Sequence, residues 1–467
     1  MTATETLAHF VHDLTFDAIP VPVRAYAKLC ILDTLGIALA GHQEPATRAA
    51  RRVAEQLGGQ SQATLLVQGS RVPVAAAALA NGTAAFSHNF TDTTLSCVIH
   101  GGPVAVPAAL AMGEAQGASG ADVLTAVVAG YEVMTRVGNA INAGSARMAH
   151  HRKGYHPTAT CGVFGAAALA AKLLGLSVHD TVQTLGVAGS LAGGLSESLT
   201  DGSDVWRSHG GIAAHNGILA AQLAQAGLTG PVAVLEGRRG FCSAFTDGQY
   251  DAEALTQGLG ERWLTLDAAF KLHNTAHVWA LPLDALAILR AQHHFAATDV
   301  EEIVVTFPQN WTAIMDDPRG ANYTPANYAQ ATNNVRYCVA VGLHEGRVYL
   351  EQFDDAHLHD PALLETARRV TPRPDAELGR IFETTDRAPT HVEVRLTSGQ
   401  RYALQVDYPR GCRQNPATQA ELEAKFAALA TPVLPASQVR RVQERLLALE
   451  TVRRMQEVLT LLCAPSS

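Results

Sequence analysis

The sequence lacks the features that mark several large protein classes. No stretch reaches the roughly 18 uninterrupted apolar residues of a membrane span. The start, MTATETLAHFVHDLTF, has acidic and histidine residues where a secretory signal would have a basic and then an apolar run. No cluster of Lys and Arg stands out, and the formal net charge is −8, which argues against a nucleic-acid partner. We therefore expect a soluble, cytoplasmic protein.

Motifs for metals and nucleotides are also missing. The sequence contains no CxxC pair, no HExxH, no Walker loop, no GxSxG elbow and no GxGxxG that follows a strand. Seven cysteines stand singly, which is typical of small buried residues and not of a secreted disulfide framework. We expect no cofactor and no metal. The cysteines are Cys30, Cys97, Cys161, Cys242, Cys338, Cys412 and Cys463.

Apolar residues are plentiful: they make up 47% of the 467 residues, against 17% charged residues. A chain of this length can bury a large core and favours two or three domains. Abundant glycine and alanine indicate closely packed interior helices. Because such helices leave apolar faces that need covering, we also expect a homodimer.

The pattern is helical from the start to about residue 265. Apolar residues recur at three- and four-residue steps after Ser119-Gly120, which predicts a helix there. The run 163–174, VFGAAALAAKLL, would place small residues on nearly every face of a helix, as expected of a helix packed on several sides. Gly175 ends this run, and Ser177 is a plausible N-cap of the next helix.

After Trp263 the pattern changes to short segments rich in β-branched residues. Strands are predicted at four places, and the last two flank a hairpin turn at Ser398-Gly399: 301–307, 347–353, 391–397 and 401–406. Helices are predicted near 275–293, 329–343 and 361–370, and a charged amphipathic helical pattern returns over 419–462. The fold class predicted is mainly α: a large helical domain from both chain ends (1–267 and 409–467) with an inserted α+β domain (268–408).

Six glycine- and histidine-bearing segments occur in an order that resembles the MmgE/PrpD family, and the resemblance runs over most of the chain. They are ILDTLGIALAG (31–41), NGTAAFSHNFTDT (81–93), GYHPTATCGVFGAAALAA (154–171), SHGGIAAHNG (208–217), NVRYCVAVGLHEGRV (334–348) and YPRGCRQNPATQAELEAKF (408–426).

The resemblance implies a set of site residues in the first half of the chain. Thr93 and His100 match polar active-site positions, and Asn89 stands where an aspartate is usual. His156 matches the family's active-site histidine, and a neutral imidazole suits proton transfer near pH 7. The place of a usual lysine falls on Trp206.

Arg207, directly after Trp206, could hold a substrate carboxylate, but its guanidinium will not release a proton. Trp206 itself suggests a flatter or more apolar substrate. Each of these residues could instead be an ordinary loop or surface residue. Without the resemblance to the family, we would interpret these residues as ordinary loop or surface residues.

In the second half, the resemblance points to Lys271 as an anchor for a substrate carboxylate. His273 and His277 are weaker candidates for substrate binding. Tyr337 matches a tyrosine that reaches the same site, although a buried aromatic on an amphipathic helix would give the same pattern. The resemblance places all these residues in a cleft between the two domains.

The family's common chemistry is removal, addition or transfer of a proton at a carbon next to a carboxylate. We expect a lyase that acts without a cofactor on a small carboxylate, either a dehydratase resembling 2-methylcitrate dehydratase or a decarboxylase resembling cis-aconitate decarboxylase. An epimerase resembling iminodisuccinate epimerase is the second interpretation. A homologue that binds a ligand without catalysis is the third. His156 and His100 would transfer protons, with Lys271 and Tyr337 completing the catalytic set.

Overall fold

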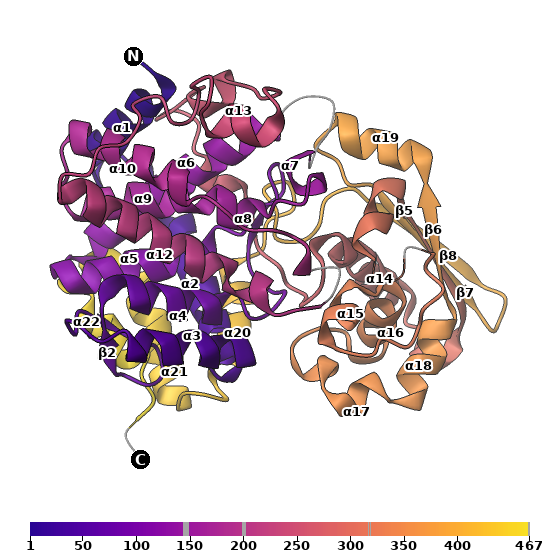
Figure 1. The fold of residues 1–467 in the computed structure, drawn as a ribbon. Helices are drawn as coiled ribbons and strands as arrows, with labels where there is room; N and C mark the ends of the chain where they lie inside the picture. Colours follow the sequence, from indigo (N-terminus) through magenta and orange to yellow (C-terminus); the bar gives the residue numbers. More distant parts are fainter. Residues whose placement is uncertain (143–148, 199–201, 316, 318, 466–467) are drawn as a thin grey trace. The chain divides into compact units, whose positions relative to one another are not determined.

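The computed structural model describes residues 1–142, 149–198, 202–315, 317 and 319–465 (Figure 1). The chain divides into two compact units. The first contains Met1–Ala269 and Thr418–Ser467, and the second contains Phe270–Ala417. The first unit is built almost entirely from helices and the second combines helices with a sheet. The prediction of a mainly α fold, with an α+β part inserted into a helical part from both chain ends, is confirmed.

Helices make up most of the first unit. In chain order they are α1 (Ala3–Asp13), α2 (Val21–Ala40), α3 (Pro45–Gln56), α4 (Val74–Ala85), α5 (Gly102–Gln116), α6 (Gly120–Ile141), α7 (Ala149–Arg152), α8 (Pro157–Thr160), α9 (Gly162–Leu173), α10 (Val178–Leu191), α12 (Val205–Gln225), α13 (Phe241–Thr246), α20 (Gln419–Ala430), α21 (Ala436–Leu447) and α22 (Gln456–Leu461). Two pairs of two-residue strands accompany them: β1 (Ala63–Thr64) with β2 (Arg71–Val72), and β3 (Thr93–Thr94) with β4 (Ala268–Ala269).

Two helices of the first unit begin at the capping residues that the sequence predicted. Ser119 caps α6 by accepting from the backbone N–H of Asp122, whose carboxylate accepts in return from the backbone of Ser119. Ser177 caps α10 in the same position. The small-sided run forms α9, whose residues 162–171 are all buried. Local sequence signals therefore decide these helix boundaries.

Glycines let the central helices of the first unit approach closely. Helix α12 packs against α4, α9 and α10, and Figure 1 shows α9 and α12 side by side. A methyl group at Gly82 of α4 would lie 2.6 Å from Cα of Gly211 of α12. A methyl group at Gly217 of α12 would lie 2.4 Å from Cβ of Ala166 of α9. Any side chain at these positions would push the helices apart.

The second unit is built on a four-stranded sheet in the order β6-β5-β7-β8. Its strands are β5 (Val300–Pro308), β6 (Val370–Asp375), β7 (Thr390–Leu396) and β8 (Arg401–Val406). Strands β5 and β6 are parallel, and the other neighbours are antiparallel. The helices are α14 (Ala280–His293), α15 (Tyr328–Asn333), α16 (Val335–Glu345), α17 (Asp355–Leu358), α18 (Pro361–Arg368) and α19 (Ala376–Thr384). Helices α14 and α16 pack on the sheet around Trp279 and Phe307.

Two details of the second unit differ from the sequence predictions. The segment 347–353 is not a strand, because the Gln352 side chain accepts from the backbone of Tyr349 and a 3₁₀ turn follows at Glu351–Phe353. Strand β6 was not predicted, because Pro372 and Pro374 argue against a strand. It lies at the sheet edge, where a missing backbone N–H is tolerated. The strands β5, β7 and β8 and the hairpin are confirmed.

Candidate active site

Three histidines from distant parts of the sequence meet in the first unit. His100 precedes α5, His156 is the N-cap residue of α8, and His209 lies on α12. The ring centroids of His100 and His156 are 6.4 Å apart, and those of His156 and His209 are 4.9 Å apart. Nδ1 of His156 lies 2.8 Å from Nδ1 of His209, so the two rings share a hydrogen bond. We call these three residues the histidine cluster.

Backbone and hydroxyl groups fix the orientation of His100. Its Nδ1 lies 2.8 Å from the backbone carbonyl oxygen of Asp92 and 3.1 Å from Oγ1 of Thr93. Its backbone N–H donates to Oγ1 of Thr158. Because a carbonyl oxygen can only accept, we infer that Nδ1 carries the proton of the neutral ring. Nε2 of His100 is then the basic nitrogen.

Burial favours the neutral form of His156 and His209. It lowers the pKa of His156 well below the ordinary value, and the nearby His209 and His100 add to this effect. It also lowers the pKa of His209 to about 4. His88, in the turn that follows α4, has its pKa lowered to about 3 by burial and by the charge of Arg207. At neutral pH these rings are therefore unprotonated.

An aromatic side chain connects the cluster with α12. The ring of Phe86, the C-cap of α4, is stacked with that of His156 at a centroid distance of 5.8 Å. It lies 5.1 Å from the His100 ring and meets the edge of Trp206 at 5.5 Å. We call Phe86 and Trp206 the aromatic wall. It gives the surroundings of His156 and His100 an apolar side.

Arg207 is held next to the aromatic wall. Its guanidinium carbon lies 4.7 Å from the centroid of the Trp206 ring, and its Nε donates to the Asp204 carboxylate at 3.1 Å. The side chain is buried and its positive charge acts on His88. Asn89 is half-buried in the turn between α4 and β3. The structure thus brings His100, Thr93, His156, Trp206 and Arg207 into one region.

A second buried network lies behind His100, and the sequence interpretation did not include it. The Asp92 carboxylate accepts from the Tyr131 hydroxyl at 2.8 Å and from the backbone of Gly102 at 3.0 Å. Burial, together with the charge of Asp33, raises the pKa of Asp92 to about 7. Asp33 pairs with Lys425 of α20 at 2.6 Å. The carboxylate of Asp92 therefore has a structural role, and it is the backbone carbonyl of Asp92 that contacts His100.

The other predicted site residues belong to the second unit. Lys271 is buried and its Nζ donates to the backbone carbonyl of Thr275 at 3.1 Å. Tyr337 is fully buried on α16, and its hydroxyl donates to the backbone carbonyl of Gln352 at 2.8 Å. Burial raises the pKa of Tyr337 further above its ordinary value. This is the environment of a packed tyrosine. His277 is half-buried and begins a 3₁₀ turn before α14.

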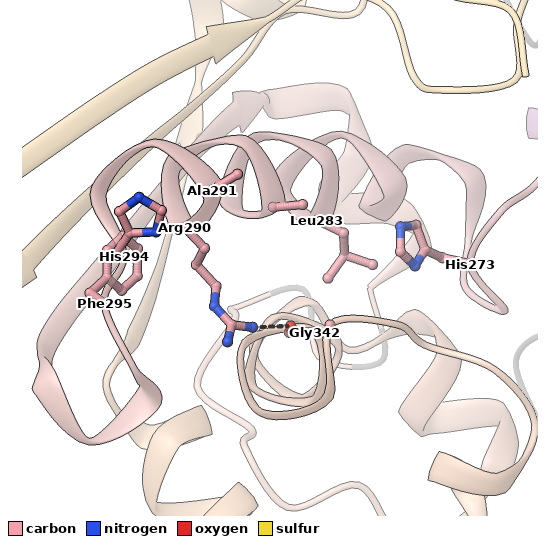
Figure 2. Close-up of a pocket in the computed structure, with 9 residues that line it drawn as sticks. His273, Leu283, Arg290, Ala291, His294, Phe295 and Gly342 are labelled. Atoms are coloured by element: carbon pink, nitrogen blue, oxygen red, sulfur yellow. Dashed lines mark hydrogen bonds between the residues drawn. The ribbon is translucent and has the colours of Figure 1, made fainter.

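His273 lines a surface pocket of about 420 Å³ that runs along α14 (Figure 2). Its Nε2 lies 3.8 Å from the Asp284 carboxylate, and burial lowers its pKa to about 4. Arg290 crosses the pocket and donates to the backbone carbonyl of Gly342 near the end of α16. The cation therefore covers the carbonyl end of a helix, which is a structural role. Lys271 and Tyr337 do not line this pocket.

His209 and Phe86 are the residues of this region that the sequence interpretation missed. Both lie inside segments that carried the resemblance, 208–217 and 81–93. Neither residue type in isolation indicates a site. Only the close approach of α4 and α12 shows that they contact His156.

Two further observations limit the kinds of site. Within the described ranges no group of three or more His, Cys, Asp or Glu side chains is placed to hold a metal ion. None of the helices in the part of the chain that the structure describes combines the length and apolar character needed to cross a membrane.

Comparison with known proteins agrees with the resemblance in the sequence. A cis-aconitate decarboxylase-like protein of Aspergillus oryzae is 28% identical over 98% of this chain and 97% of its own. A cis-aconitate decarboxylase of Aspergillus terreus is 27% identical, and the human cis-aconitate decarboxylase is 28% identical. These two alignments each cover 99% of this chain and at least 95% of the relative.

Two family models match the chain in succession. The model of the MmgE/PrpD N-terminal domain matches residues 5–253, and that of the C-terminal domain matches residues 273–451. Together they span both units and all three residues of the histidine cluster. The chain belongs to the MmgE/PrpD family of enzymes.

Proposed function

We propose that this enzyme is a lyase that releases carbon dioxide from a small unsaturated polycarboxylate and transfers a proton to a carbon next to a remaining carboxylate. The observation that carries the proposal is the histidine cluster: the buried His156 and His209 and the half-buried His100 are held in fixed orientation, with an apolar wall beside them. We rank decarboxylation before dehydration because the relatives carry the name cis-aconitate decarboxylase.

The chemistry fits what an imidazole can do. In a substrate of the cis-aconitate type, the leaving carboxylate sits on a carbon next to a carbon–carbon double bond. When its C–C bond breaks, the electron pair forms a new double bond, and the original π pair moves to the carbon next to another carboxylate. That carbon then takes a proton from an imidazolium, and the imidazole takes one back from water. The step is balanced in protons and in charge. The protein only holds the substrate in position and supplies the proton.

The bound substrate would itself stabilise the protonated form of His156. His156 is neutral in the free enzyme because burial disfavours its charged form. A bound carboxylate a few ångströms away favours the imidazolium and raises its pKa. Binding would therefore load His156 with a proton at the moment that the carbanion needs one. We assign proton transfer to His156, with His100 as the second imidazole.

The aromatic wall affects the choice of substrate. Trp206 and Phe86 present ring surfaces next to His156, where a carboxylate would lose its hydration without an opposite charge. Arg207 is paired with Asp204 and stacked on Trp206. We propose that the substrate turns an apolar or flat portion toward this wall, so that it carries fewer charges than a tricarboxylate. We assign Lys271 to one of its carboxylates.

The test is incubation of the enzyme in deuterated water with a panel of di- and tricarboxylates, followed by mass spectrometry. The panel contains cis-aconitate and analogues in which one carboxylate is replaced by methyl or phenyl. We expect loss of carbon dioxide, one deuterium in the product, and neither in the variant His156→Asn. If no member of the panel loses carbon dioxide while the protein is folded, decarboxylation is wrong.

Epimerisation is the second candidate, because two imidazoles, His100 and His156, stand 6.4 Å apart by ring centroids. One neutral imidazole can remove a proton from one face of a carbon while the other, as an imidazolium, gives a proton to the opposite face. The same experiment separates the two. An epimerase would place deuterium in unreacted dicarboxylate with no change of carbon count.

A further inference from the structure

We infer that His209 is a positioning residue that sets the tautomer of His156 and takes up its charge during proton transfer; this rests on the proposed proton-transfer function. The observation is the 2.8 Å distance between the Nδ1 atoms of the two rings. A distance this short between two ring nitrogens requires one proton between them, since two lone pairs would repel.

The shared hydrogen bond leaves two arrangements for the neutral pair. In one, His156 donates through Nδ1, its Nε2 carries a lone pair and acts as a base, and His209 holds its own proton on Nε2. In the other, His209 donates, and His156 presents an N–H at Nε2. The proton between the rings therefore decides whether His156 meets the substrate as a base or as a donor.

Charge can move through the same bond. When Nε2 of His156 takes a proton, the ring becomes an imidazolium, and its Nδ1 proton can pass to Nδ1 of His209. His156 is then neutral again with an N–H at Nε2, and His209 carries the positive charge. No atom leaves the pair, and only one proton has entered it. Among the described residues, neither His156 nor His209 has a hydrogen-bond partner at Nε2.

The surrounding structure holds His209 in this position. The next two residues, Gly210 and Gly211, pack against Pro103 of α5 and Leu79 of α4. A methyl group at Gly210 would be 2.7 Å from Cβ of Pro103. On the other side, a methyl group at Gly194 would be 3.7 Å from Nε2 of His209. His209 is 3% exposed and has little room to turn.

Kinetics of two variants and one control test the inference. His209→Asn places an amide where Nδ1 stands, so it keeps a hydrogen bond to His156 but cannot carry the charge. His209→Ala removes both. The control His215→Asn changes a half-buried histidine on the same helix, whose Nδ1 contacts Asn216. We expect His209→Asn to lower kcat at least about tenfold with KM within about twofold, His209→Ala to lower it further, and the control to match the parent.

A normal kcat in His209→Asn would overturn the relay and leave His209 a simple orienting contact. A normal kcat in His209→Ala would overturn any role. A measurement without substrate keeps this test separate from the proposed function. In ¹⁵N NMR of histidine-labelled protein, the signals lost in His156→Asn and in His209→Asn identify the pair. One ring should be protonated at Nδ1 and the other at Nε2. Two rings protonated only at Nε2 would refute the inference even if the enzyme's reaction proved different.

Discussion

Acidification to pH 5.5 should destabilise the first unit, because this unit buries several histidines in the neutral state. Burial lowers the pKa of His209 and of His150 to about 4 and that of His88 to about 3. In an unfolded chain these rings titrate near 6.5. Between pH 6.5 and pH 4 the unfolded chain therefore binds more protons than the folded unit. The folding stability of the first unit that depends on these neutral histidines is fully present above pH 6.5 and is lost as the pH falls.

The magnitude follows from the cited pKa values. At pH 5.5 each of the three rings costs about 1.4 kcal/mol relative to neutral pH, or about 4 kcal/mol in all. Asp92 acts in the opposite direction: its pKa is raised to about 7, so its protonation on acidification stabilises the folded unit by about 2 kcal/mol. His156, whose pKa is also lowered, adds to the loss. The raised pKa values of Glu132 and Glu44 oppose this loss. A net loss of about 2 kcal/mol is a large part of a typical domain's stability.

The assay is urea unfolding at pH 7.5, 6.5 and 5.5, followed by circular dichroism. His150→Gln is the matched variant, because the amide can replace Nε2 in the 2.9 Å contact with Thr160 without titrating. It should reduce the difference in unfolding free energy between pH 7.5 and 5.5 by about 1.4 kcal/mol. An unfolding free energy that does not change with pH, or a variant with the parent's full pH dependence, would refute the reasoning.

Four other predictions concern activity and assembly. His156→Ala should lower turnover by roughly 10²–10⁴-fold with little change in substrate affinity, as measured by kcat and KM on a variant with unchanged circular dichroism. Lys271→Ala should raise KM as well as lower kcat, since a charge on the substrate carboxylate acts in ground and transition states alike. Dialysis against a chelator should leave activity intact, and restoration of lost activity by zinc, iron or magnesium would count against this. Sedimentation at micromolar concentration should give a homodimer, and a monomer would contradict the expected covering of apolar faces.

The fold could be predicted where local chemistry decides it. The caps at Ser119 and Ser177 act on residues three positions away, and β5, β7 and β8 carry a local β-branched pattern. Strand β6 could not be predicted, because Pro372 and Pro374 break the β-branched pattern that marks the other strands. The same holds for 347–353, where the side chain of Gln352 forms a local turn that outweighs the β-branched pattern.

Some residues of the candidate site could likewise be predicted from local motifs, and others could not. His100 and His156 could be predicted as candidates because motifs around them resemble a family, and the structure places them in one region with Thr93 and Trp206. Tyr337 shows the limit of that approach. The sequence pattern of a site tyrosine and of a packed tyrosine is the same, and only the hydrogen bond to the Gln352 carbonyl shows how the hydroxyl is used.

The glycines of α12 explain why a histidine that looked ordinary in the sequence reaches the site. Gly211 lies where any side chain would meet the backbone carbonyl of Leu79 at 2.2 Å, so α12 and α4 can touch backbone to backbone. Since Phe86 ends α4 and His209 precedes Gly210 on α12, the same close approach brings both toward His156. The glycine pair allows the two helices to meet, and the histidine before it contacts His156, as the proposed proton transfer requires. A larger residue at 211 would push α12 away from α4 without changing any histidine.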